Sequence, residues 1–146
     1  MRIFLDANVL FSAAKSDGAV RKLLALLDKD GHELWVDGYV VEEASRNLAA
    51  KAPDGVAMLG RLLAHMKAAR AQPRDSALEA SLPLPAKDRP VLAAAIRQGC
   101  TALVTGDKTH FGALYGRTIR GVMIHSPRSL AEALLARGPS QPRASD

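Results

Sequence analysis

With 146 residues, of which 48% are apolar and 24% charged, the chain has the length and balance of one globular domain that can bury a core, which leaves no room for a second domain. Lys and Arg outnumber Asp and Glu by 20 to 15, and the resulting net charge of +5 favours an anionic partner. The only cysteine, Cys100, excludes an internal disulfide and fits a reducing, cytoplasmic location.

The start of the chain lacks the long apolar stretch of a signal peptide, because three apolar residues are followed at once by Asp6. No later run approaches the roughly 18 apolar residues that span a bilayer. We therefore expect a soluble protein with no membrane contact.

The first half of the chain alternates apolar runs with helical periodicity. Asp37-Gly38 and Pro53-Asp54-Gly55 are turn or break signals between these segments. Apolar runs predict strands, and apolar residues at helical spacing predict helices. The predicted elements are a strand at Ile3–Leu5, a short helical turn at Val9–Ala14, a helix at Ala19–Asp28, a strand at His32–Val36, a helix at Tyr39–Lys51 and a long helix at Gly55–Ala71.

The second half continues the alternation after residues 72–87, where three prolines leave the structure least defined and a short edge strand at Leu78–Leu82 is one interpretation. The remaining predicted elements are a helix at Val91–Ile96, a strand at Ala102–Thr105, a short helix at Phe111–Tyr115, a strand at 122–124 and a helix at Pro127–Ala136. We expect one domain over residues 1–137 and a disordered tail at 138–146.

This order of elements predicts an α/β fold, namely a three-layer α/β/α sandwich with a central parallel sheet of four to five strands. Ligands of such sheets collect beyond the carboxyl ends of the strands. Asp6 and Asp107 each follow an apolar strand directly and precede a predicted helix. Both side chains should therefore lie in the crevice at that end of the sheet.

Each acid also has an interpretation without chemistry. Asp6 and Asp107 could be helix caps, and Asp88, placed two residues before Pro90, is an even better candidate for an N-cap. Glu42 and Glu43 are adjacent on a predicted helix, so only one of them can face the end of the sheet. Taken singly, either glutamate is most simply a solvated charge.

Four separated segments together resemble the PIN-domain ribonucleases. They are Phe-Leu-Asp-Ala-Asn-Val-Leu at 4–10, Val-Val-Glu-Glu-Ala-Ser-Arg-Asn-Leu at 40–48, Asp-Arg-Pro-Val-Leu-Ala-Ala-Ala-Ile at 88–96 and Leu-Val-Thr-Gly-Asp at 103–107. The first and the last are the most specific, and the match spans nearly the whole chain.

The resemblance implies an acidic quartet of Asp6, Glu43, Asp88 and Asp107, supported by Asn8 and Thr105. Glu43 is preferred over Glu42 because the acid of the family stands at the later helical position. It also implies one or two Mg²⁺ or Mn²⁺ ions, RNA as the substrate and, as in many bacterial VapC-type members, a small antitoxin protein as a partner.

Two further points follow from the resemblance. Family members commonly pair through helices, so a homodimer is plausible and the helix at Gly55–Ala71 is the candidate surface. Many relatives carry a further acid at the position of His110, and its replacement puts a second metal ion in doubt.

Several basic residues lie near the acids in the sequence and could hold an RNA backbone, although any one of them is more simply a solvated surface charge. The candidates are Lys15, Arg46, Lys87, Arg89, Lys108 and His110. Lone histidines such as His110 and His125 are more often structural, and Trp35, Tyr39 and Tyr115 are better interpreted as packing residues than as a platform for bases.

Two alternatives compete with a ribonuclease. A haloacid-dehalogenase-like phosphatase would use Asp6 as its nucleophile, but that chemistry normally needs a second acid two residues later, where this chain has Asn8. A non-catalytic PIN-like module would bind RNA or protein and keep its acids for structure. The presence of all four acids favours the enzyme.

Overall fold

The computed structural model describes residues 1–70 and 72–137, and the tail expected at 138–146 lies outside them. The strands form one six-stranded sheet of order β3-β2-β1-β4-β6-β5. These strands are β1 (Arg2–Leu5), β2 (Glu33–Val36), β3 (Lys67–Ala68), β4 (Ala102–Val104), β5 (Thr118–Ile119) and β6 (Val122–His125). All neighbours are parallel except β5 and β6, which are antiparallel.

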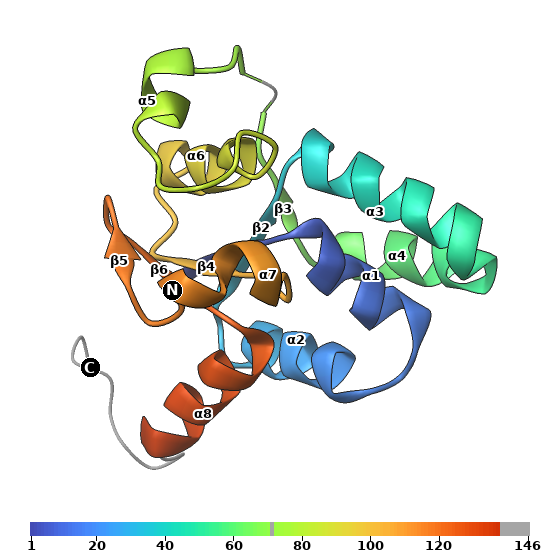
Figure 1. The fold of residues 1–146 in the computed structure, drawn as a ribbon. Coiled ribbons are helices and arrows are strands. Elements are labelled where there is room, and N and C mark those ends of the chain that lie inside the picture. The colour runs from blue at the N-terminus through green and yellow to red at the C-terminus, as the bar shows by residue number, and fades with distance from the viewer. Residues whose placement is uncertain (71, 138–146) are drawn as a thin grey trace.

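Helices flank the sheet (Figure 1). They are α1 (Ala7–Lys15), α2 (Ala19–Lys29), α3 (Gly38–Lys51), α4 (Val56–Leu63), α5 (Ser76–Ala80), α6 (Arg89–Arg97), α7 (Lys108–Phe111) and α8 (Pro127–Arg137), with 3₁₀ turns η1 (Pro53–Gly55) and η2 (Gly112–Leu114). Helix α1 packs against α2, α3 and α4, whereas α5 packs against α6 on the other side of the sheet. The expected α/β fold with a central, mostly parallel sheet is confirmed.

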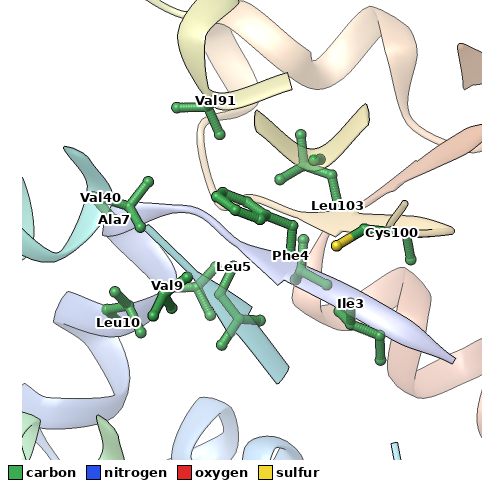
Figure 2. Packing of buried hydrophobic residues seen from close by; sticks show 14 of the residues in the cluster. Ile3, Phe4, Leu5, Ala7, Val9, Leu10, Val40, Val91, Cys100 and Leu103 are labelled. Carbon is green, nitrogen blue, oxygen red and sulfur yellow. The ribbon is translucent and has the colours of Figure 1, made fainter. Parts of the chain in front are cut away.

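The core is built on the central strand β1, whose Ile3, Phe4 and Leu5 are all fully buried. Figure 2 shows Phe4 on the side of Val91 and Leu103, while Leu5 points the other way, toward helix α1. An apolar strand without polar alternation is typical of a parallel strand that is covered on both faces. This packing fixes where β1 ends, and therefore where Asp6 begins the next segment.

Two short strands and two helices differ from the expectations. The sheet has six strands rather than four or five, because β3 and β5 have only two residues each and leave no periodic pattern to detect. The predicted helix at Gly55–Ala71 ends at Leu63, and its last part contains β3. The segment proposed as an edge strand at Leu78–Leu82 instead overlaps helix α5, which Asp75 caps through the backbone N–H of Leu78.

Among the residues that the structure describes, no helix has both the length and the apolar character needed to cross a membrane.

Gly55 lies where η1 meets α1 and α3, and it leaves no room for a side chain. An added Cβ would lie 2.8 Å from Leu48 Cδ2 and 3.0 Å from the carbonyl oxygen of Ala14. We expect Gly55→Ala to lower the free energy of unfolding by about 1–3 kcal/mol, because the backbone oxygen cannot move away easily.

Urea denaturation of the purified domain measures this effect. The matched control is Gly60→Ala in α4, where an added Cβ meets nothing within 4 Å. Alanine is the better helix former there, so the control should be neutral or stabilising by up to about 1 kcal/mol. Equal effects of the two substitutions would contradict close packing at Gly55.

Candidate active site

The sheet brings two acids together because β1 and β4 are parallel neighbours. Asp6 follows β1 directly, and its backbone N–H donates to the carbonyl of Val104 at the end of β4 (3.0 Å). Asp107 follows three residues after Val104. Both acids therefore lie at the carboxyl edge of the sheet, as the order of elements predicted.

All four predicted acids line one cleft of about 200 Å³. Its lining residues are Asp6, Asn8, Tyr39, Glu43, Asn47, Lys87, Asp88, Val91 and Asp107. Glu43 reaches the cleft from the second turn of α3. Glu42 is exposed instead and pairs with Arg46 (3.7 Å), so the structure places the later glutamate, and not the earlier one, beside the other acids.

Thr105 and Asn8 hold the Asp6 carboxylate in position. The fully buried Thr105 donates its hydroxyl to Asp6 Oδ2 (2.8 Å), and the amide of Asn8 donates to the same oxygen (3.3 Å). The backbone N–H of Gly106 in turn donates to Asn8 Oδ1 (2.7 Å), and that of Asp107 donates to Thr105 Oγ1 (3.1 Å). These bonds tie the ends of β1 and β4 together.

Burial makes the Asp6 carboxyl a weaker acid than usual. Its pKa is raised from 3.8 to about 6, mainly by loss of solvent and to a smaller extent by the nearby charge of Glu43. The hydrogen bonds from Thr105, from the Ala7 backbone and from Asn8 act in the opposite direction. Around neutral pH the cleft thus holds a desolvated negative charge that a cation would stabilise.

The cap interpretation of the acids is confirmed for two of them and wrong for the third. Asp6 accepts from the backbone N–H of Ala7 (2.7 Å), and Asp107 accepts from that of His110 (3.2 Å). Asp88, the strongest candidate for a cap, makes no such bond. Pro90 has no N–H at the second helical position, and Asp88 itself has a helical backbone rather than the extended one of an N-cap.

His110 is partly buried and contacts two of the acids, although it is not among the residues that line the cleft. Its Nδ1 is 2.8 Å from Asp107 Oδ2 and 3.2 Å from Asp88 Oδ2. The oxygen of Asp88 is shielded from solvent and has no hydrogen-bond partner among the described residues. A carboxylate oxygen left in this way fits a metal cation, and clustered carboxylates are the donor set that Mg²⁺ and Mn²⁺ accept.

Of the six basic residues predicted to hold RNA, only Lys87 lines the cleft. Arg46 is paired with Glu42, and Arg89 donates to the carbonyl of Leu84 (2.8 Å), so both are engaged elsewhere. Lys15 lies over the ring of Phe11, and Lys108 is exposed; neither is among the residues that line the cleft.

Two polar residues of the cleft were not anticipated as site residues. Tyr39 is 46% exposed, so its interpretation as a packing residue is wrong; its hydroxyl donates to the carbonyl of Lys87 (3.2 Å) at the cleft. Asn47 stands four residues after Glu43 on α3, and this spacing on one helical face was the signal that could have identified it. Tyr115 instead packs partly buried and donates to the carbonyl of Thr105 (2.8 Å).

The other candidate histidine has a structural environment. Nδ1 of His125 lies 3.2 Å from the hydroxyl oxygen of Ser129, and burial lowers the pKa of His125. His125 is the last residue of β6, and it is not among the residues that line the cleft.

Fold and site together define an α/β domain with an acid-lined cleft at the carboxyl ends of its parallel strands. The family model described as "PIN domain" matches residues 2–109, and the chain belongs to the PIN-domain family. The resemblance in the four segments is thereby confirmed. No curated protein matches the chain.

Two solved structures share the fold. One is the structure of VapBC2 from Rickettsia felis bound to a DNA fragment from their promoter. One chain of that structure is 16% identical to this chain, with a TM-score of 0.64, and the match covers 86% of this chain and 98% of the VapBC2 chain. The other is PAE2754 from Pyrobaculum aerophilum, with 21% identity and a TM-score of 0.63, covering 93% of this chain and 96% of that one.

Proposed function

We propose that the protein is a metal-dependent endoribonuclease with Asp6, Glu43, Asp88 and Asp107 as its acidic quartet. The observation that carries this proposal is that four carboxylates from four separated segments line one cleft. Their mutual repulsion and the burial of Asp6 are costs that a divalent cation would remove. Membership of the PIN-domain family supports the same conclusion.

In this proposal Asp6, Asp88 and Asp107 are the direct ligands of one or two Mg²⁺ or Mn²⁺ ions, and Glu43 contributes directly or through water. When bound, the cation activates water for attack on a phosphodiester and neutralises charge on the phosphate. Thr105 and Asn8 orient Asp6, since each donates to Oδ2 of its carboxylate. We expect products with a 5′-phosphate and a 3′-hydroxyl.

The proposed substrate is RNA, whose backbone would enter over Lys87, with Tyr39 exposed beside it. The proposed setting is the toxin of a cytoplasmic toxin–antitoxin pair, and likeness of fold to a chain of VapBC2 supports it. A small antitoxin would then cover the acid-lined cleft, with a basic side chain facing the carboxylates. A gene for such a protein should lie beside the gene for this chain.

The decisive experiment incubates the purified protein with a labelled RNA and with the matching DNA, in Mg²⁺, Mn²⁺ or EDTA. Cleavage of RNA that needs the metal and leaves a 3′-hydroxyl supports the proposal. RNA binding without cleavage would favour a non-catalytic module. Release of phosphate from a phosphomonoester, with a phosphate trapped on Asp6, would favour the phosphatase, an alternative that the PIN-domain membership leaves without support.

Lys87 provides a prediction about RNA binding. Lys87→Gln should weaken RNA binding several-fold and lower the salt dependence of binding by about one phosphate contact, because one charge at the cleft is lost. Filter binding in EDTA, at several salt concentrations, measures this without cleavage. The matched control is Lys15→Gln, which removes a lysine that does not line the cleft and should bind as the parent does. Equal losses for both would mean that RNA binds elsewhere.

A homodimer is a further proposal. Its candidate surface is helix α4, which is shorter than the helix predicted at Gly55–Ala71. Helix α4 ends at Leu63, and Val56 at its start is exposed. Sedimentation of the purified chain as a monomer at all concentrations would end this proposal.

A further inference from the structure

His110 contributes the only nitrogen to a compact group of donor atoms. Its Nδ1 and one oxygen each of Asp88 and Asp107 all lie within 4.8 Å of one another. The two contacts of Nδ1, 2.8 Å to Asp107 and 3.2 Å to Asp88, resemble the edge of an octahedral shell, which is about 3 Å when metal–ligand distances are about 2.1 Å. The nitrogen and the two oxygens are thus close enough together to bind one ion.

A second observation concerns Asp88. Its Oδ2 is shielded from solvent and accepts no hydrogen bond from any described residue. Nδ1 of His110 can carry only one proton, and the shorter of its two contacts directs that proton to Asp107 and not to Asp88. A buried acceptor without a donor is costly, so the direction in which Asp88 Oδ2 points is best explained by a cation.

We propose that Nδ1 of His110 is a metal ligand, and that the resulting mixed nitrogen and oxygen site favours a first-row transition-metal ion such as Mn²⁺ over Mg²⁺. This inference rests on the proposed function and refines its choice of metal. Mg²⁺ is a hard ion that is bound almost entirely by oxygen, whereas imidazole is a common ligand of transition metals. A carboxylate at the same position would remove this preference.

The competing role for His110 is that of a positioning residue that donates a hydrogen bond to Asp107 and touches no metal. Both roles would reduce activity when His110 is replaced, so activity cannot separate them. Metal coordination can be distinguished from a hydrogen bond to Asp107, because only coordination binds the imidazole nitrogen directly to the ion. A paramagnetic ion reports such a nitrogen directly.

Mn²⁺ alone, added to the full chain and studied by electron spin-echo envelope modulation, is therefore the first test. We expect nitrogen modulation in the parent protein, its loss in His110→Gln and its retention in His65→Gln. The latter is the matched control, since the exposed His65 also lies near an aspartate (3.6 Å to Asp28 Oδ2), but this aspartate is not one of the proposed metal ligands.

The second test measures the Mn²⁺ affinity of the parent and of His110→Asp by electron paramagnetic resonance, with Mg²⁺ as competitor. We expect the ratio of the two dissociation constants to move toward Mg²⁺ by at least about tenfold in the variant. Mn²⁺ binding without nitrogen modulation, or an unchanged ratio, would overturn the inference and leave the nuclease intact. Failure of the parent to bind Mn²⁺ would overturn the inference, and failure to bind Mg²⁺ as well would also overturn the proposed metal-dependent nuclease. Thermal melts of both variants verify that each is folded.

Discussion

Asp6→Asn should abolish RNA cleavage and, at the same time, make the metal-free protein more stable. The loss of activity is expected to be at least about 100-fold, because a candidate metal ligand is replaced by a neutral amide. The gain in stability has a separate cause. Folding places the ionised Asp6 carboxylate in a buried position, where its pKa is raised to about 6.

The direction of the pH dependence follows from that pKa. The folded state binds the Asp6 proton more tightly than the unfolded state, whose carboxyl has a pKa near 3.8. The stability contributed by this group is therefore fully present below about pH 4 and is lost as the pH rises through about 6. Since one pKa unit corresponds to about 1.4 kcal/mol, the loss reaches roughly 3 kcal/mol at neutral pH.

Urea denaturation of both proteins in EDTA, at several pH values, isolates this effect. The advantage of Asp6→Asn should be near zero at pH 4 and largest above pH 6, and Mn²⁺ should reduce it because only the parent site is complete. Asp75→Asn, at an exposed N-cap outside the cleft, is the control and should cleave RNA normally. Unchanged cleavage by Asp6→Asn would remove the proposed site, and a less stable variant would show that burial is not the dominant influence on Asp6.

Thr105→Val should reduce cleavage by about 10–100-fold even though Thr105 is proposed to bind neither metal nor RNA. Its hydroxyl donates to Asp6 Oδ2 and accepts from the backbone N–H of Asp107, so it orients both acids. Valine has nearly the same shape and no hydroxyl. The partly buried Asp107 N–H and the buried Asp6 oxygen would each lose a partner, which also costs about 1–3 kcal/mol of stability.

The pH profile separates this role from a packing role. The Thr105 hydrogen bond lowers the pKa of Asp6, so its removal should raise that pKa further and move the acidic limb of the activity profile to higher pH. Thr105→Ser keeps the hydroxyl and should restore the profile, although it leaves a small cavity. A profile that stays in place in Thr105→Val would show that the hydroxyl does not act on Asp6.

The carboxyl ends of β1 and β4 could be predicted from the sequence because Asp6 and Asp107 each follow a short, fully apolar run. Such a run is typical of a strand that is buried on both faces, and its end fixes the position of the next side chain. Glu43 could be chosen over Glu42 only through the family resemblance, since helical geometry says that one of them faces inward and not which.

The features that the sequence did not predict depend mostly on contacts between segments that are distant in the sequence. β3 has two exposed residues, and hydrogen bonding to β2, not its own composition, makes it a strand. Asp88 resembled a helix cap because local sequence shows the neighbouring proline but not the carboxylate and imidazole across the cleft. The contact of His110 with Asp88 was hidden for the same reason, whereas its contact with Asp107 is local, since the two residues are three positions apart at α7.

The two margins of the sheet have a consequence for how copies of this chain can meet. One margin is β3 and the other is β5, and each strand offers only two residues of backbone. Edge strands this short offer few unpaired backbone N–H and C=O groups to a strand of another copy. They therefore disfavour aggregation by edge-to-edge strand pairing. We therefore expect side chains of the described helices and loops, rather than sheet edges, to hold several copies of this chain together.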